Sequence, residues 1–319
     1  MGAARASNHL VTRVVVSEFL PENHLDLLRL RFDVVYDPEL YADRARLLIE
    51  IGDAAAVFIR NRTLIDQELL DAATSLRVVG RLGVGMDNID MVGCAGVGVI
   101  VIPAAGANAV SVAEYVIGAM LVLVRGVYDM TPSMVAGEWP RQGHAFGHEF
   151  LGKTLGLVGF GSIARQVAMR AAAFGMGIVA HDPLLPDDDG AWGMVGKVDL
   201  ETLLSTSDVV SLHVPLDDGT RNLIDADALE TMKPSAILVN TSRGGIVDET
   251  ALAEALRNHR LGGAALDVFS TEPLGPKPAA TFAGVPNLLL TPHVAGNTVE
   301  SVERVGTVVV NAVIEFLEG

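Results

Sequence analysis

Short runs of β-branched and other apolar residues alternate along the chain with longer segments of helical periodicity. In the first third these runs are VVVSEF, VFIR, RVVGRLG and VGVIVIP, and later come TLGLVGF, GIVAHD, DVVSLHVP, AILVNTS, AALDVF and LLLTPH. Such alternation predicts parallel strands, because a helix-length connection is needed to return the chain to the same edge of a sheet. The predicted fold class is α/β with two doubly wound open parallel sheets.

The runs divide into two groups, which predicts two domains. We expect one domain over residues 1–104 completed by 295–319, and a second over 105–294. A Rossmann-type nucleotide domain would thus be inserted in a flavodoxin-like substrate domain, with a ligand-binding cleft between the domains. The helix after GANAVSVAE is expected to carry the chain between them, and a last helix is expected over Val299–Leu317.

Composition indicates a globular protein with large cores. Of 319 residues, 50% are apolar and 19% are charged. The most apolar stretch, Val116–Val124, is too short to span a bilayer and predicts a buried core helix. The opening MGAARASNHLVTR lacks the apolar segment of a secretory signal and is interpreted as a tail. We therefore expect a cytoplasmic protein without a membrane partner.

Charge and cysteine content exclude further classes. The chain has 39 acidic and 23 basic residues, a net charge of −16, which would repel a phosphate backbone and argues against nucleic-acid binding. The surplus acid fits either solubility or a salty habitat. Cys94 is the single cysteine, so no internal disulfide is possible, a reducing cytoplasm is expected, and no metal site is predicted.

A glycine-rich turn lies in KTLGLVGFGSIARQVA, between an apolar strand and a helical run. Gly159, Gly161 and Ala164 match the pattern G-x-G-x-x-A. The first glycine permits a tight turn, the second lets backbone approach a pyrophosphate, and the alanine keeps helix and strand close. The pattern alone is weak evidence, but its position before a helix N-terminus favours a dinucleotide site.

An acidic residue ends the next strand, GIVAHD. Asp182 lies about 20 residues beyond the glycine turn, where a carboxylate accepts both ribose hydroxyls of the adenosine and repels a 2′-phosphate. The predicted cofactor is therefore NAD rather than NADP. Asp187, Asp188 and Asp189 would add to the repulsion if their loop folds back, or would form a solvated acidic loop.

Three more polar residues follow apolar strands. Arg243 comes after ILVNTS, Glu272 lies in a proline-bounded loop after LDVF, and His293 follows LLLTP. Each has an ordinary structural interpretation, but a guanidinium suits a carboxylate and a glutamate can hold a histidine for proton transfer. We therefore interpret His293 as a proton donor and acceptor.

These motifs give the chain a clear resemblance to a known family. Over nearly its whole length it resembles the D-isomer-specific 2-hydroxyacid dehydrogenases, in the motifs NTSRGGIVD, LDVFSTEPL and TPHVAGNT together with the nucleotide turn. The resemblance implies that Arg243, Glu272 and His293 are the catalytic residues. It also implies a homodimer paired through the helix near Val110–Val124.

The resemblance further implies cofactor and substrate contacts. The implied NAD contacts are Gly159, Phe160, Gly161, Ser162, Ile163, Asp182, Val214, Pro215, Thr241, Ser242 and Asp267. The implied substrate contacts are Arg60, Arg243 and the backbone near Val84 and Gly85. One departure is Ala164, where the family often has a third glycine, and a methyl group is small enough to be tolerated there.

Within the family, VSEF, YDPEL and VFIRNRT followed by GRLGVGMDNID are most similar to sulfolactate dehydrogenases, with phosphoglycerate dehydrogenase-like members also similar. The first-choice substrate is (S)-3-sulfolactate, with Arg60, Arg62 and Arg141 supplying charge for a second anionic group. 3-Phosphoglycerate and hydroxypyruvate or glyoxylate are alternatives, and a corepressor-like NAD(H) sensor is the non-enzyme alternative. Glu272 argues against formate dehydrogenases, which have glutamine there.

Overall fold

The computed structural model describes residues 12–128, 130–141 and 147–319. The chain forms two compact units, each described here by itself. One runs to Asn108 and resumes at Asn297–Gly319, and the other is Ala109–Gly296. Nearly all of the predicted N-terminal tail lies outside the described residues.

The first unit contains a five-stranded parallel sheet with strand order β2-β1-β3-β4-β5, the flavodoxin-like arrangement. Its strands are β1 (Arg13–Val16), β2 (Asp33–Tyr36), β3 (Ala56–Ile59), β4 (Val78–Arg81) and β5 (Ile100–Pro103). Four of them were predicted from apolar runs. The fifth, β2, is a partly exposed edge strand that the sequence did not reveal.

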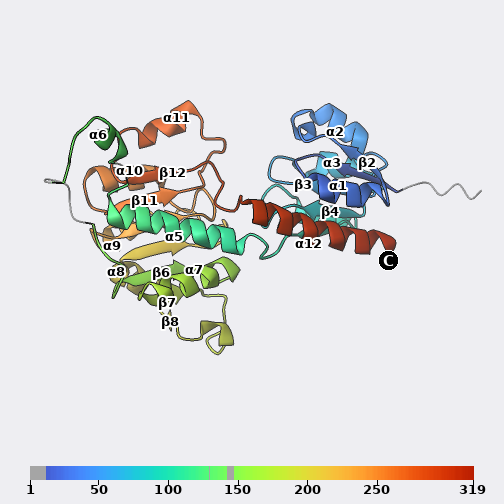
Figure 1. Cartoon of the computed structure of the whole chain (residues 1–319). Helices are drawn as coiled ribbons and strands as arrows, with labels where there is room; N and C mark the ends of the chain where they lie inside the picture. The colour runs from blue at the N-terminus through green and yellow to red at the C-terminus, as the bar shows by residue number, and fades with distance from the viewer. Residues whose placement is uncertain (1–11, 129, 142–146) are drawn as a thin grey trace, which may run out of the picture. The chain divides into compact units, whose positions relative to one another are not determined.

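Helices cover both faces of this sheet (Figure 1). They are α1 (Glu22–Arg29), the 3-10 turn η1 (Leu40–Ala42), α2 (Arg44–Ile51), α3 (Gln67–Ala72), α4 (Met91–Gly96) and α12 (Val299–Glu318). Val14 and Val16 pack with α1 and α12, whereas Val15 packs with α2, α3 and α4. This alternation explains why the strands are apolar at successive positions. The predicted last helix is confirmed as α12.

The second unit contains a seven-stranded parallel sheet with strand order β12-β11-β10-β9-β6-β7-β8. Its strands are β6 (Thr154–Val158), β7 (Gly177–His181), β8 (Gly196–Lys197), β9 (Val209–Leu212), β10 (Ile237–Asn240), β11 (Gly263–Leu266) and β12 (Leu288–Leu290). All six predicted strands are present, and only the two-residue edge strand β8 was not predicted. The strand order reverses at β6, as in a Rossmann-type sheet.

Helices also cover both faces of the larger sheet (Figure 1). They are α5 (Ala109–Arg125), α6 (Thr131–Val135), α7 (Ser162–Ala173), α8 (Leu200–Thr206), α9 (Ala226–Thr231), α10 (Glu249–Arg257) and α11 (Pro276–Ala279), with 3-10 turns η2 (Gly190–Trp192) and η3 (Ala280–Phe282). The apolar stretch in α5 is a core helix, as predicted, because Val116, Met120 and Val124 are buried against the sheet. Within the described part of the chain, no helix is both long enough and apolar enough to cross a membrane.

Candidate active site

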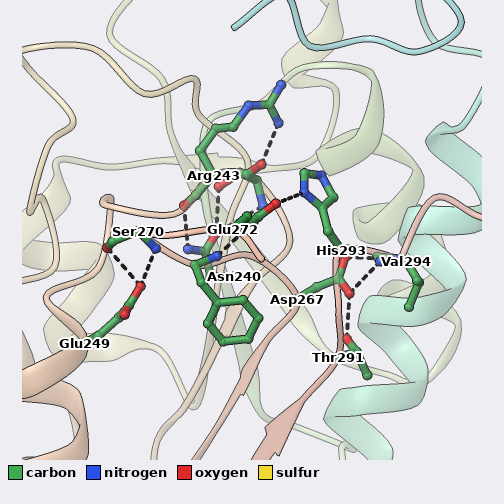
Figure 2. A network of polar contacts seen from close by, with 12 residues as sticks. Asn240, Arg243, Glu249, Asp267, Ser270, Glu272, Thr291, His293 and Val294 are labelled. Atoms are coloured by element: carbon green, nitrogen blue, oxygen red, sulfur yellow. Dashed lines mark hydrogen bonds and ion pairs between the residues drawn. The ribbon is translucent and has the colours of Figure 1, made fainter. Parts of the chain in front are cut away.

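Three predicted site residues follow neighbouring strands of the seven-stranded sheet. Arg243 comes after β10, Glu272 after β11 and His293 after β12, and these strands are adjacent in the sheet. Because parallel strands end at the same edge, the three loops meet there. Figure 2 shows the Glu272 carboxylate pointing toward the His293 ring.

A short hydrogen bond joins the predicted acid–base pair. His293 Nδ1 lies 2.7 Å from Glu272 Oε2, and the Phe269 amide donates to Glu272 Oε1 at 3.0 Å. Burial alone would raise the pKa of Glu272, but the hydrogen bonds from His293 and Phe269 lower it below its usual value. The positive charge of Arg243 acts in the same direction. Glu272 is therefore ionised at neutral pH and can stabilise a protonated imidazole.

The turn that carries His293 is organised by a buried carboxylate. Asp267 is 1% exposed and accepts hydrogen bonds from Thr291 Oγ1 at 2.6 Å and from the amides of Val294 and Ala295 at 2.9 and 2.8 Å. Its backbone carbonyl accepts the His293 amide at 2.7 Å. His293 has a φ of 55°, a left-handed conformation that non-glycine residues rarely adopt. Asp267 thus holds the backbone that aims the imidazole at Glu272.

The turn that carries Arg243 is held by Asn240, a residue that the sequence analysis missed. Asn240 is 1% exposed, donates through Nδ2 to the Arg243 carbonyl at 2.9 Å, and accepts from the Ser242 amide and hydroxyl at 3.0 and 2.8 Å. The signal for it was an amide side chain at the last position of a fully buried strand. A buried amide in such a position is retained where it satisfies backbone groups.

The Arg243 and Glu272 loops also pack closely against one another. A Cβ atom on Gly244 would lie only 1.9 Å from the backbone carbon and oxygen of Phe269, so only glycine fits there. Nearby, Ser270 donates through its amide and hydroxyl to Glu249 Oε1 at 2.6 and 2.9 Å, as Figure 2 shows. The two loops are therefore fixed as one assembly.

The predicted nucleotide turn follows β6, in the centre of the sheet. Gly159 has a φ of 85°, and a Cβ there would lie 2.7 Å from the His213 carbonyl oxygen, so glycine is required. By contrast, a Cβ on Gly161 would meet nothing within 4 Å, which leaves open space over the turn. Ala164 is fully buried between helix and sheet. These three positions fit the roles that the pattern predicts.

The amino end of α7 also fits a pyrophosphate. Helices α2, α3, α8, α9 and α10 each begin with an aspartate that accepts a backbone amide, whereas α7 begins at Gly161 with no side-chain cap. Its first amides therefore lack the acidic partner that those helices have, and they carry the positive end of the helix dipole. A dinucleotide phosphate would supply the missing acceptor.

The Asp182 carboxylate borders a cavity of about 580 Å³ that Lys197, Asp199 and Thr202 also line. Its Oδ2 accepts the Phe160 amide at 2.9 Å, and its Oδ1 accepts the amides of Leu184 and Leu185. The carboxylate is thus fixed at the end of β7, beside the turn. A carboxylate in this position fits the ribose of a bound adenosine.

The acidic loop beyond Asp182 is structured. Asp187 pairs with Lys197, and Asp189 caps η2 by accepting the Ala191 amide at 2.7 Å. Asp188 is exposed. Two of the three aspartates therefore have structural partners. Neither the predicted repulsion of a 2′-phosphate nor the predicted solvated loop includes these contacts.

The other predicted cofactor residues in this unit also follow strands. Val214 and Pro215 come after β9, and Thr241 and Ser242 come after β10. The buried hydroxyl of Thr241 has no hydrogen-bond partner among the described residues. His213, at the end of β9, is hydrogen-bonded to Ser211, and burial lowers its pKa to about 3. This histidine stays neutral at physiological pH, unlike the charged form that the proposed role of His293 requires.

Apart from Arg243, the predicted substrate contacts lie in the first unit, at the carboxyl edge of its sheet. Arg60 follows β3, and Val84 and Gly85 follow the neighbouring strand β4. Burial lowers the pKa of Arg60, partly offset by the negative charge of Glu18. Arg81 is 8% exposed and donates through Nε to the Gly85 carbonyl at 2.7 Å, which shapes the Val84 loop.

Comparisons with known proteins agree with this architecture. The family model described as "D-isomer specific 2-hydroxyacid dehydrogenase, NAD binding domain" matches residues 117–295 of this chain. An (S)-sulfolactate dehydrogenase from Chromohalobacter salexigens is 52% identical over 94% of this chain and 96% of its own. A hydroxypyruvate reductase from Thermotoga maritima is 37% identical over 96% of this chain and 98% of its own.

A solved structure, the TT0316 protein from Thermus thermophilus, superimposes with a TM-score of 0.87 at 36% identity and covers 97% of both chains. The match extends over both parallel-sheet units. Since the NAD-binding description covers more than half of the chain and the relatives align over almost all of it, the chain belongs to the D-isomer-specific 2-hydroxyacid dehydrogenase family and is an NAD-dependent oxidoreductase.

Proposed function

We propose that Arg243, Glu272 and His293 are the catalytic residues of this dehydrogenase, acting at C2 of a small D-configured 2-hydroxy acid. The observation that carries the proposal is the 2.7 Å hydrogen bond between His293 Nδ1 and Glu272 Oε2. These residues lie in the loops after β12 and β11, and β11 is the neighbour of β10, whose loop carries Arg243. An ionised glutamate fixed on one ring nitrogen leaves the other nitrogen to exchange a proton with substrate.

The proposed mechanism assigns one task to each side chain. The turn at Gly159–Ile163 and Asp182 would hold NAD, which would supply the hydride acceptor for oxidation and, as NADH, the hydride donor for reduction. His293 Nε2 removes the hydroxyl proton during oxidation and returns it during reduction, while Glu272 stabilises the imidazolium. Arg243 binds the carboxylate and the developing charge on the C2 oxygen. We further propose that Arg60 and the backbone near Val84 and Gly85 bind the acid.

Replacement of Glu272 by glutamine is expected to shift the pH profile of reduction. Reduction needs a protonated His293, so its rate falls as pH rises. The lowered pKa of Glu272 keeps it ionised well below neutral pH, and its charge therefore favours the imidazolium over the whole working range. In Glu272→Gln the fall in kcat/KM should begin at lower pH than in the wild type.

The matched control is Glu303→Gln, which alters a second Glu–His pair, with His24, in the other unit. We expect the control profile to overlay that of the wild type. An unmoved profile in Glu272→Gln would break the proposed catalytic pair.

For the substrate we propose (S)-3-sulfolactate and its oxidised partner 3-sulfopyruvate, with 3-phosphoglycerate, hydroxypyruvate and glyoxylate systems as alternatives. The 52% identity to the Chromohalobacter salexigens protein supports this choice. In sulfolactate the sulfonate-bearing carbon outranks the carboxylate, so the spatial arrangement of D-lactate is labelled S. Of the three arginines considered for the second anionic group, Arg60 is the most buried, whereas Arg62 and Arg141 are exposed. Arg62 also lies over the Tyr41 ring and is hydrogen-bonded to the Tyr41 hydroxyl.

Steady-state oxidation of NADH with a panel of 2-oxo acids tests this choice. A sulfonate accepts hydrogen bonds from arginines that the methyl group of pyruvate would leave unpaired, a difference of about 1–3 kcal/mol. We therefore expect kcat/KM for 3-sulfopyruvate to exceed that for pyruvate by roughly 5- to 150-fold. Equal values, or a clear preference for hydroxypyruvate or 3-phosphohydroxypyruvate, would contradict the substrate and leave the reaction class intact.

We also propose a cytoplasmic homodimer paired through α5. Much of α5 is occupied within its own unit, where Val112 and Val116 are buried, so the pairing would use its other face, including Val110 at 37% exposure. Sedimentation at micromolar concentration should give a dimer, and a monomer alone would contradict the pairing. The single cysteine fits a reducing cytoplasm, which cell fractionation would test.

A further inference from the structure

A buried carboxylate lies beneath the loop that carries Arg60. Glu18, just after β1, is 4% exposed. Its Oε1 accepts the amides of Arg60 at 2.7 Å and Thr63 at 3.0 Å, and the Arg62 amide lies 3.3 Å from both carboxylate oxygens. Three backbone amides of one short loop therefore converge on a single side chain.

The carbonyl groups of the same loop are held by a second side chain. Asn88 donates through Nδ2 to the carbonyls of Arg60 at 3.0 Å and Thr63 at 2.7 Å. The hydroxyls of Ser17 and Thr63 are also hydrogen-bonded, at 2.8 Å, in a fully buried contact. With these backbone groups satisfied from two sides, the loop is fixed by its own protein partners.

The side chain that this loop presents differs from several other arginines of the unit. Arg13, Arg44 and Arg46 are each paired with carboxylates. Within the described ranges, the half-buried guanidinium of Arg60 has no such ion pair or hydrogen bond, and Glu18 acts on it only through its charge. A partly desolvated guanidinium without a bound acid suits an incoming carboxylate or sulfonate.

We propose that Glu18 is a positioning residue for substrate binding, which fixes the backbone of residues 60–63 so that Arg60 meets the anionic substrate. The proposal rests on the proposed function, in which Arg60 contacts the acid. Glu18 would act before the chemical step, by removing the cost of ordering the loop when substrate binds. Its loss should therefore change KM much more than kcat.

Glu18→Gln tests this role with little change in shape. The glutamine oxygen can still accept hydrogen bonds from the amides of Arg60 and Thr63. Its NH₂ group is a donor, however, and would face the Arg62 amide, which is also a donor. We expect KM for the 2-oxo acid to rise about tenfold with kcat within about twofold of the wild type and the Kd for NADH unchanged. The matched control is Glu22→Gln, which removes an exposed carboxylate paired with Arg29 and should leave KM unchanged.

A double-mutant cycle separates positioning from general stabilisation. If Glu18 acts through Arg60, the double variant Glu18→Gln with Arg60→Ala should have a KM less than about twofold above that of Arg60→Ala alone. If Glu18→Gln is poorly stable, Asn88→Ala loosens the same loop from its carbonyl side and should give the same rise in KM and the same lack of additivity. Thermal unfolding of each variant should not follow the order of the KM values.

Two outcomes would overturn the proposal. One is an unchanged KM in Glu18→Gln, or in Asn88→Ala where that variant is used because it is the stable one. The other is that Glu18→Gln raises KM equally whether or not Arg60 is present. An unchanged KM in Arg60→Ala alone would count against the proposed role of Arg60 in substrate binding, and would remove the basis for positioning as well. A rise in Arg60→Ala with none in Glu18→Gln would count against Glu18 only.

Discussion

Replacement of His293 by alanine is expected to lower turnover by roughly 10²-fold or more, while NADH still binds. The imidazole is the proposed carrier of the substrate proton, and its loss leaves Glu272 without the group that it orients. The nucleotide turn at Gly159–Ile163 is built from β6 and α7, so removal of the ring leaves it intact. Steady-state turnover and titration of NADH fluorescence measure the two quantities.

His259 offers a matched control, because it is an exposed histidine of the same unit that also has a left-handed backbone, with a φ of 53°. We expect turnover of His259→Ala within about twofold of the wild type. Nearly unchanged turnover in His293→Ala would end the catalytic assignment. A parallel loss of NADH binding would show instead that the substitution disturbed the fold of the unit.

Replacement of Asp182 by alanine is expected to raise the ratio of kcat/KM for NADPH to that for NADH by about tenfold or more. The Asp182 carboxylate would repel a 2′-phosphate and accept the ribose hydroxyls of NADH. Both of its oxygens are fixed by backbone amides, so the charge cannot rotate away from the cofactor. Alanine at position 182 should therefore weaken NADH binding and also relieve the repulsion of the 2′-phosphate of NADPH.

Asp188→Ala is the control for charge alone, since Asp188 is an exposed residue of the neighbouring acidic loop. Its coenzyme preference should match that of the wild type. If Asp182→Ala kept the wild-type ratio, Asp182 would not be the residue that selects NAD.

The fold was largely predictable because every internal strand has an apolar run bounded by turns. The two strands that were missed, β2 and β8, both lie at sheet edges. β2 has the partly exposed sequence DVVY, and β8 contains only Gly196 and Lys197. The other two edge strands, β5 and β12, have apolar runs, whereas the pairing of β2 and β8 depends more on hydrogen bonds to a neighbour than on a readable hydrophobic pattern.

The placement of the candidate site was predictable for a similar geometric reason. Parallel strands end at one edge of a sheet, so polar residues after β10, β11 and β12 must lie near one another. Asn240, Asn88 and Glu18 were not assigned such roles, because their partners are mostly backbone groups. Those groups lie in the following turn for Asn240 and in a distant loop for Asn88 and Glu18. Which amides and carbonyls need a partner is settled only when those loops fold together.

Direct hydride transfer between NADH and C2 of a D-configured acid can be followed with deuterium. The protein would be incubated with 3-sulfopyruvate and NADH that carries deuterium at both C4 positions, and the product would be analysed by NMR and chiral chromatography. We expect (S)-3-sulfolactate with deuterium at C2. A product without deuterium at C2 would rule out direct hydride transfer from NADH, and the R isomer would rule out the D configuration.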